Sequence, residues 1–258
     1  MTSLLSPLAG VPVAVFGVGA GCGSDLALGI ADLGAPLALL CSPGETEVAE
    51  HTAAQAVSGG ARATVVPFDP ASAASIADAI AKAADEIGEV RAVVDIARPG
   101  MAASPKALSD VDEAGWDERV TAPLASALHR LQGSYRSLRA AGGRVVLVLP
   151  TLSMSGAAGM VPWTTVSEGQ RALAKVAARA WGAEGITVNC LAVPGHLLAP
   201  QHDTAVPLDR PGLPDVSLGR LPEARSDVAR AVAGLLGDGL PFVTGATISV
   251  DGGVWMTP

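Results

Sequence analysis

Charged and aromatic side chains are scarce in this sequence, and no cluster of basic residues occurs in it. Charged residues make up 16% of the 258 residues and aromatic residues 3%, whereas hydrophobic residues make up 49%. With a formal net charge of −8, the chain offers no basic surface for nucleic acid or an anionic membrane. So apolar a composition argues against disorder and predicts a globular protein with a large core.

Cysteine is also rare, and the spacing of the cysteines indicates whether disulfides or a metal site are expected and in which cellular compartment the protein is found. Cys22, Cys41 and Cys190 are far apart and show neither CxxC nor Cys/His spacing. This pattern favours reduced thiols over disulfides or a metal site. The apolar N-terminal segment has no basic residue ahead of it and is interrupted by prolines and glycines, so it is expected to be neither a signal peptide nor a membrane span. We expect a cytoplasmic protein without a metal.

Short apolar runs alternate with helical patterns along the whole chain. Because continuous apolar strands joined by helices are typical of a parallel sheet covered on both faces, the pattern predicts an α/β fold, a single-domain doubly wound Rossmann-type sheet over residues 1–258. A proline-rich segment at about 196–216 is too long for a connector and is expected to be a lid over a site. Strands are expected at 11–16, 37–40, 63–67, 92–96, 144–149, 187–192 and 247–250, and helices at 24–33, 45–57, 71–87, 110–133, 167–181 and 225–236.

A glycine-rich turn joins the first expected strand to the first expected helix. It contains Gly17, Gly21 and Gly23. Glycines there let a pyrophosphate approach the backbone, and the helix N-terminus offers it free N–H groups. The alternative is that the glycines only pack the helix against the sheet. In this context the turn predicts a nucleotide site.

Further motifs follow in order along the chain, and with the turn they resemble short-chain dehydrogenases/reductases. The spacing Gly17-x-x-x-Gly21-x-Gly23 is similar to the fingerprint of that family, and Asp69 lies where the family has an Asp that contacts adenine. The other matching motifs are 185–189 (Gly-Ile-Thr-Val-Asn), Pro194-Gly195, 219–223 (Gly-Arg-Leu-Pro-Glu), Thr244-Gly245 and 251–253 (Asp-Gly-Gly).

The resemblance implies a Tyr general acid, a Lys four residues later, a Ser and an Asn, and none of these stands at its position. The corresponding residues are Trp163, Ser167, Pro150 and Pro123. An indole N–H cannot act as an acid near pH 7, and serine cannot carry the positive charge of the lysine. Near Pro150, Thr151, Ser153 and Ser155 are close enough to replace the serine.

Misalignment does not explain the absence of the Tyr and of the Lys four residues after it. Tyr135 is the only tyrosine, and it precedes the strand that should lead to the active-site helix. The lysines are Lys82, Lys106 and Lys175, and none stands four residues after a tyrosine. The remaining titratable candidates near the expected cleft are His129, His196 and His202. The alternative for each is that it is an ordinary surface or core histidine with no catalytic role.

The cofactor positions are altered as well. Where the family has an acid for NAD or a basic residue for NADP, this chain has Cys41-Ser42-Pro43, so no charge selects between the two. Arg98 replaces a glycine beside the cofactor, and it either crowds that site or pairs with Asp95. The threonine that binds the carboxamide in the family aligns with Ala199. If NAD or NADP binds at all, the expected cofactor-binding residues are Gly17, Gly21, Gly23, Ser42 and Asp69.

Three functions stay open. The first is a non-catalytic subunit of a hetero-oligomer with an active short-chain dehydrogenase, since the family commonly assembles through two helices, here about 110–133 and 167–181, and through the C-terminal end. The second is an NAD(P)-dependent oxidoreductase or a non-redox enzyme with altered catalytic residues, and the third is a small-molecule binding or sensing protein. The interface helix carries an apolar stripe that would fit a homo-oligomer equally well: Ala172, Leu173, Val176, Ala177 and Ala180.

Overall fold

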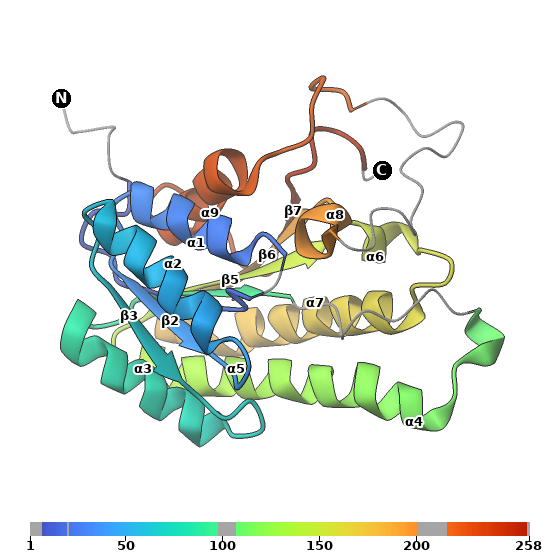
Figure 1. Ribbon diagram of the computed structural model, residues 1–258, viewed down its shortest axis with the longest axis horizontal. Helices are drawn as coiled ribbons and strands as arrows, with labels where there is room; N and C mark the ends of the chain where they lie inside the picture. The colour runs from blue at the N-terminus through green and yellow to red at the C-terminus, as the bar shows by residue number, and fades with distance from the viewer. Residues whose placement is uncertain (1–6, 20, 98–106, 201–215, 257–258) are drawn as a thin grey trace.

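The strands of this protein form a single parallel sheet. The computed structural model describes residues 7–19, 21–97, 107–200 and 216–256 (Figure 1). Seven strands pair in the order β3-β2-β1-β4-β5-β6-β7, and every pairing is parallel. The predicted doubly wound α/β fold is therefore confirmed. The strands are β1 (Val13–Phe16), β2 (Leu37–Cys41), β3 (Ala63–Pro67), β4 (Ala92–Ile96), β5 (Gly143–Pro150), β6 (Ile186–Val193) and β7 (Thr247–Ser249).

Helices cover both faces of the sheet, so the strands are apolar on both sides. Helices α1, α2 and α9 lie over one face and α3, α5 and α7 over the other (Figure 1). Val13 and Val15 join the first core, whereas Ala14 and Phe16 join the second, because successive side chains of a strand point to opposite faces. The main helices are α1 (Gly23–Asp32), α2 (Thr46–Ser58), α3 (Ala73–Ile87), α5 (Ala122–Leu138), α7 (Val161–Trp181) and α9 (Ala229–Leu236).

Two helical segments, those predicted at 110–133 and 167–181, differ clearly in the structure from the sequence prediction. The segment expected as one helix at 110–133 is a 3₁₀ turn, η1 (Leu108–Asp110), a short α4 (Glu113–Trp116), a π-helical turn, η2 (Asp117–Thr121), and then α5. Pro123 stands in the first turn of α5, directly after the π-helical turn η2. Helix α7 begins six residues before the predicted 167, again with a proline in its first turn.

Several short elements were not predicted. They are α6 (Leu152–Ser155), α8 (Gly195–Leu198) and the 3₁₀ turn η3 (Gly182–Glu184). The helix predicted at 225–236 is present as the π-helical turn η5 (Ala224–Val228) followed by α9. Helix α8 occupies the beginning of the segment predicted as a lid. Residues 201–215 of that segment lie outside the described residues, so the lid stays a prediction.

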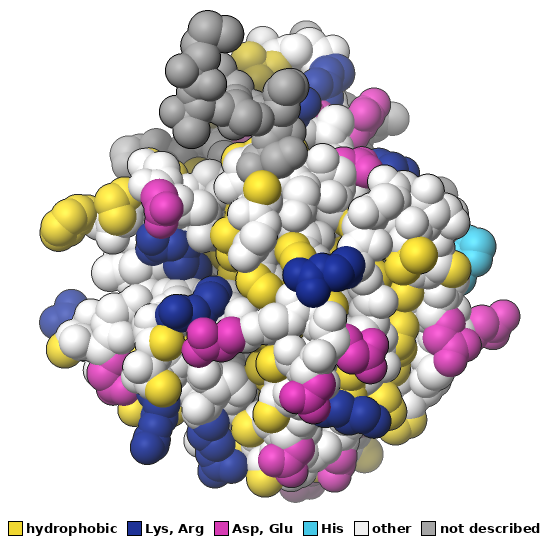
Figure 2. All heavy atoms as spheres, turned by 90° about the vertical axis from the view of Figure 1, so that its left-hand side faces the viewer, with side chains coloured by type: hydrophobic (Ala, Val, Ile, Leu, Met, Phe, Trp, Pro, Cys, Tyr) yellow, Lys and Arg dark blue, Asp and Glu magenta, His cyan; other side chains and the backbone are white. Residues whose placement is uncertain are grey.

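The surface carries charges of both signs. On the face shown in Figure 2, basic and acidic side chains are interspersed and do not gather into one basic patch. Within the described ranges, no helix has the length and apolar character needed to cross a membrane. The three cysteines are buried free thiols.

Candidate functional site

The candidate site lies at the carboxyl ends of β1 and β4, where the strand order reverses. Open α/β sheets bind ligands in the crevice at such a switch point. A cavity of about 460 Å³ opens there, with Phe16 and Gly17 of the first strand and turn in its wall. Pro123 of α5 and Val166 of α7 line it from the helical side. The fold thus brings the glycine turn and one of the predicted catalytic positions, Pro123, to the same cavity.

Two glycines of the turn are required by close backbone packing. A Cβ atom on Gly17 would lie 2.4 Å from the carbonyl oxygen of Ile96, and one on Gly23 would lie 2.3 Å from the carbonyl oxygen of Gly17. The φ angle of Gly17, +81°, also lies in the region that favours glycine. Packing therefore explains these two glycines with or without a ligand.

Helix α8 lies against the same turn. A Cβ atom on Gly21 would lie 2.3 Å from the carbonyl oxygen of Leu197, and that oxygen accepts the backbone N–H of Cys22 at 2.7 Å. N–H groups at the start of a helix are the ones that bind a pyrophosphate in this kind of turn. Leu197 thus already occupies the N–H of Cys22, one of the groups at the start of α1 that a pyrophosphate would use.

At the end of β2 the structure places a carboxylate that sequence reasoning missed. One Oε of Glu45 accepts the backbone N–H of Ser42 at 2.9 Å and also accepts the Ser42 hydroxyl. Glu45 is 4% exposed, and its side chain lies beside Gly19 in the glycine turn. Residues 41–43 themselves carry no charge, but the fold adds the carboxylate of Glu45 beside Ser42. The available signal was an acid three residues after Ser42, at the N-cap of α2.

Asp69 lies beyond β3, at the rim of the site. Its carboxylate accepts the backbone N–H of Ala71 at 2.9 Å, and its own N–H donates to the Ser75 hydroxyl. Its neighbours Phe68 and Pro70 line the cavity, whereas Asp69 itself does not. Its observed role is to hold the turn before α3.

Asp95 at the end of β4 forms a buried ion pair, but its partner comes from α5. Nε of Arg130 lies 2.9 Å from both carboxylate oxygens, and the two side chains are 13% and 4% exposed. Arg130 also donates to the Ser126 hydroxyl at 2.8 Å. Arg98, for which pairing with Asp95 was one of two alternatives, lies outside the described residues. The Asp95–Arg130 pair links the sheet to α5 at the wall of the cavity.

The position expected for the general acid is filled by packed apolar side chains. Trp163 is 6% exposed and belongs to the hydrophobic core together with Leu198 and Ala199. A Cβ atom on Gly195 would lie 3.3 Å from Cη2 of Trp163 and 2.4 Å from Cδ2 of Leu152. Both side chains therefore pack directly against the Pro194-Gly195 turn. Trp163 places no titratable group there.

The other positions at which the family has catalytic residues are also occupied by side chains without an acid or a base. Ser167 is fully buried, and its hydroxyl donates to the carbonyl oxygen of Trp163 one helical turn earlier, at 2.8 Å. Pro150 ends β5, where it pairs with Val193 of β6. Pro123 lines the cavity at the start of α5. Trp163 and Ser167 share α7, but neither they nor the two prolines supply a group able to exchange protons near neutral pH.

Of the three residues near Pro150, Ser153 is held most firmly. Its hydroxyl contacts the Pro150 carbonyl oxygen at 3.0 Å and Oε1 of Glu168 at 2.9 Å, and Glu168 pairs with Arg171 at 2.9 Å. Thr151 donates its backbone N–H to β6, and Ser155 is exposed. Ser153 is thus close to the expected serine position, but no hydrogen bond joins it to a described histidine or lysine.

The single tyrosine is not part of the site. Tyr135 lies in α5, stacks on Trp181 with ring centroids 5.0 Å apart, and donates its hydroxyl to the carboxylate of Glu184 at 3.0 Å. That hydrogen bond raises the pKa of Tyr135 above its ordinary value. Lys82 in α3 and Lys175 in α7 are exposed, and Lys106 lies outside the described residues.

The candidate histidines are dispersed. His129 contacts the carbonyl oxygen of Pro70 through Nδ1 at 3.2 Å. His196 lies in α8, and its buried Nδ1 has no hydrogen-bond partner among the residues that the structure describes. His202 lies outside them. Among the described residues no histidine is hydrogen-bonded to Ser153.

The cysteine thiols are not activated either. Burial raises the pKa of Cys22 to about 11 and that of Cys190 to about 12, so neither forms a thiolate near neutral pH. Burial also raises the pKa of Cys41.

Comparison with known proteins identifies the family. The family described as enoyl-(acyl carrier protein) reductase matches residues 17–255. The chain belongs to the short-chain dehydrogenase/reductase family.

Curated relatives are similar over most of their length. The 3-oxoacyl-(acyl-carrier-protein) reductase of Pseudomonas aeruginosa is 28% identical to this chain, and the matched region covers 97% of this chain and 99% of the reductase. The acetoacetyl-CoA reductase of Rhizobium meliloti is 30% identical, and the matched region covers 73% of this chain and 78% of that reductase. A crystal structure of a dehydrogenase/reductase from Sinorhizobium meliloti superimposes with a TM-score of 0.78 at 26% identity, covering 98% and 97% of the two chains.

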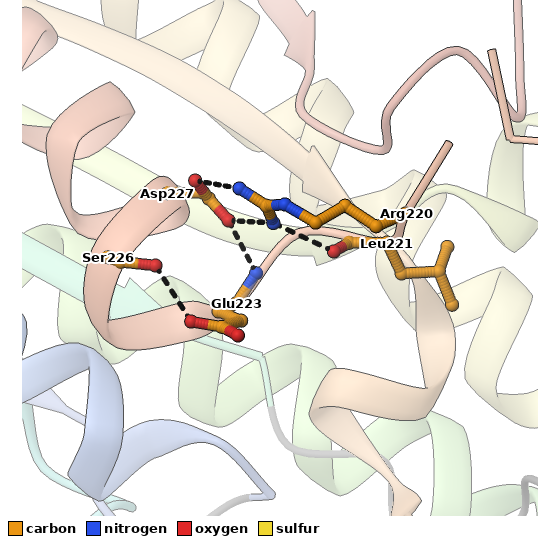
Figure 3. Close-up of polar contacts among 5 residues, drawn as sticks. All are labelled: Arg220, Leu221, Glu223, Ser226 and Asp227. Atoms are coloured by element: carbon orange, nitrogen blue, oxygen red, sulfur yellow. Dashed lines mark hydrogen bonds and ion pairs between the residues drawn. The ribbon is translucent and has the colours of Figure 1, made fainter. Parts of the chain in front are cut away.

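The C-terminal motif of this short-chain dehydrogenase builds the start of its last helix. Arg220 forms a two-pronged ion pair with Asp227, whose carboxylate also accepts the backbone N–H of Glu223 at 2.8 Å (Figure 3). Glu223 in turn accepts the hydroxyl of Ser226 (Figure 3). In this chain the motif therefore holds the turn that leads into η5 and α9.

Proposed function

We propose that this member of the short-chain dehydrogenase/reductase family does not transfer hydride itself and serves as a non-catalytic subunit beside an active member of the family. Reduction of a carbonyl needs an acid that protonates the oxygen in the transition state. The observation that carries the proposal is the packing of Trp163 and Leu152 against Gly195, where that acid and the substrate oxygen would meet. The Cys22–Leu197 contact supports it from the cofactor side.

The surface expected to hold the partner is available on α5 and α7. Val176 is 66% exposed and Leu128 is 39% exposed, and Ala172 and Ala180 of the predicted stripe are also exposed. Ala177 is instead 5% exposed and packs in the core, so the stripe is narrower than predicted. An active subunit with the same fold would present the same pair of helices to this surface.

Co-expression with an active short-chain dehydrogenase of the 3-oxoacyl reductase type tests the proposal. Native mass spectrometry of the purified complex should show a hetero-oligomer, and Val176→Arg should abolish it because the new charge would have to be buried. Val57→Arg is the matched control, since Val57 is 54% exposed but lies on α2. A pure homo-oligomer of this chain in the presence of the active enzyme contradicts the subunit proposal.

An altered enzyme is the second candidate, either an NAD(P)-dependent oxidoreductase or a non-redox enzyme. The named relatives are reductases, and the buried Nδ1 of His196 beside Pro194-Gly195 is the titratable group closest in sequence to that turn. Such an enzyme would have to move α8 away from Cys22 before NAD or NADP binds. Calorimetric titration with both cofactors, followed by turnover of acetoacetyl-CoA that His196→Ala abolishes, would favour this candidate over the first.

A small-molecule binding or sensing protein is the third candidate, supported by the cavity between the sheet and α5 and α7. It predicts a ligand-induced rise in melting temperature without turnover. The cytoplasmic location stays a prediction under all three.

A further inference from the structure

Helix α8 lies beside the start of α1 and contacts the glycine turn with its own backbone (Figure 1). The carbonyl oxygen of Leu197 accepts the N–H of Cys22 at 2.7 Å, and a Cβ atom on Gly21 would lie 2.5 Å from the carbonyl group of Leu198. N–H groups at the start of a helix attract acceptors with negative charge, and a carbonyl oxygen carries such a charge in part. The protein backbone thus satisfies an N–H group that a ligand would otherwise use.

One side chain does most to hold α8 in this position. The helix is a single turn of four residues. A helix this short is not stable by itself, so tertiary contacts must keep it in place. Leu198 provides the main contact, because it is 1% exposed and belongs to the same hydrophobic core as Cys22 and Trp163. We therefore regard Leu198 as the anchor of α8.

The observed position of α8 also has a cost, which arises at His196. Nδ1 of this side chain is buried, and no donor or acceptor among the described residues reaches it. Buried polar atoms are nearly always hydrogen-bonded, and one without a partner costs free energy that contact with water would recover. The packing of Leu198 therefore favours the observed position of α8, and the burial of His196 opposes it.

From these observations we propose that α8 is an autoinhibitory latch, which leaves the glycine turn and unfolds as one unit, and that only its open form leaves the N–H of Cys22 free for a ligand. Gly195 fixes the near end of the latch, because the side chains of Leu152 and Trp163 pack against it. Segments with few buried contacts open locally at a lower free energy than the whole protein unfolds. The inference concerns access to the turn, and it holds whether or not the chain has a partner subunit.

Native-state hydrogen exchange, measured by NMR on the unmodified chain, tests the latch. The backbone N–H groups of Cys22 and Ala199 donate to carbonyl oxygens of α8, whereas that of Val13 donates to Pro36 between β1 and β2. If α8 opens as a unit, Cys22 and Ala199 should share one protection factor, at least about tenfold below that of Val13. Different protection factors for Cys22 and Ala199, or protection of both equal to that of Val13, overturns the proposal.

Two leucine variants assign the opening to α8. Leu198→Ala should speed the exchange of Cys22 by more than about tenfold, because it removes the anchor of the closed form. Leu236→Ala is the matched control: Leu236 of α9 is 3% exposed in the same core and stays packed when α8 opens. It should speed the exchange of Val13 and leave that of Cys22 unchanged. Unchanged exchange of Cys22 in Leu198→Ala, or a rise in Leu236→Ala as large as that of Val13, overturns the latch.

Adenosine diphosphate is the probe for the inhibitory role, since it carries a pyrophosphate but no nicotinamide. A ligand that binds only the open form gains apparent affinity in proportion to the population of that form. Calorimetry should therefore show that adenosine diphosphate binds Leu198→Ala more tightly than the wild type, by the same factor as the rise in Cys22 exchange. Equal affinity for the two proteins, or binding to neither, overturns the inhibitory role. Native mass spectrometry tests the partner subunit separately, so failure of one proposal is distinguishable from failure of the other.

Discussion

The backbone N–H of Cys22, at the start of α1, donates to the carbonyl oxygen of Leu197 at 2.7 Å. Two segments that are far apart in the sequence thereby meet at the glycine turn. The contact satisfies an N–H group that would otherwise face the crevice, and it places the backbone of α8 where a phosphate would approach. The glycine turn therefore acts as a packing surface in this structure.

The first prediction concerns Gly21, which allows this contact. Gly21→Ala should destabilise the protein by about 2–4 kcal/mol, because φ is +42° and the new Cβ would overlap the Leu197 carbonyl. Gly44→Ala is the control: Gly44 has φ +90° but nothing within 4 Å, so only the backbone strain of about 1–2 kcal/mol is expected. Urea denaturation measures both. Equal losses of unfolding free energy for the two variants would show that the contact between α8 and Gly21 does not limit the size of residue 21.

The second prediction concerns the role of Trp163 in the core. Trp163→Ala should cost about 3–5 kcal/mol of unfolding free energy, the usual loss when a buried aromatic side chain is removed. Trp116→Ala is the comparison, because Trp116 is 38% exposed and should cost much less. A loss below about 1 kcal/mol for Trp163→Ala would mean that its indole is not a core side chain.

The strand pattern could be read from the sequence because parallel strands covered on both faces are continuously apolar. β3 and β4 have the bounds predicted for them, and the others differ by one or two residues. The segment before α5 could not be predicted, since a π-helical turn depends on local packing and leaves no clear sequence period.

Of the residues that the motifs singled out, Gly17, Ser42 and Pro123 line the cavity, but the motifs did not show what these residues contact. The loss of the Tyr and Lys was visible in the sequence from the count alone. The Arg130–Asp95 pair and the Leu197–Cys22 hydrogen bond join residues 35 and 175 positions apart, and only the fold brings them together. Glu45 was overlooked because the sequence does not show that its side chain folds back onto Ser42.

The third prediction is a pH dependence. Hydrogen bonds from Arg220 and from the Glu223 backbone lower the pKa of Asp227 below its ordinary value. A carboxyl group whose pKa is lowered by folding stabilises the protein above its unfolded pKa and loses this contribution as the pH falls through the acidic range. Asp227→Asn should thus be less stable than the wild type near pH 7, and the difference should shrink in acid.

The effect at Asp227 should be small and should decrease with added salt, because the pair with Arg220 is exposed. Urea midpoints at neutral and acidic pH measure it. Asp238→Asn is the matched control, since Asp238 is fully exposed and its contact with Arg144 is longer, at 3.4 Å. A stability difference that does not change with pH would assign the Asp227 effect to packing.

The last prediction asks whether the family's Tyr and Lys can be restored. Ser167→Lys should destabilise the protein by several kcal/mol, because residue 167 is fully buried and the charge of a lysine would be buried with it. Ser58→Lys is the control: its hydroxyl also bonds the carbonyl oxygen four residues earlier, but Ser58 is exposed, so a change within about 0.5 kcal/mol is expected. The double variant Trp163→Tyr, Ser167→Lys should still not oxidise NADPH with acetoacetyl-CoA, since Leu152 and the Cys22–Leu197 contact are unchanged in it. Turnover by the double variant would show that the two missing side chains were the sole obstacle, and that α8 opens readily enough to admit the cofactor.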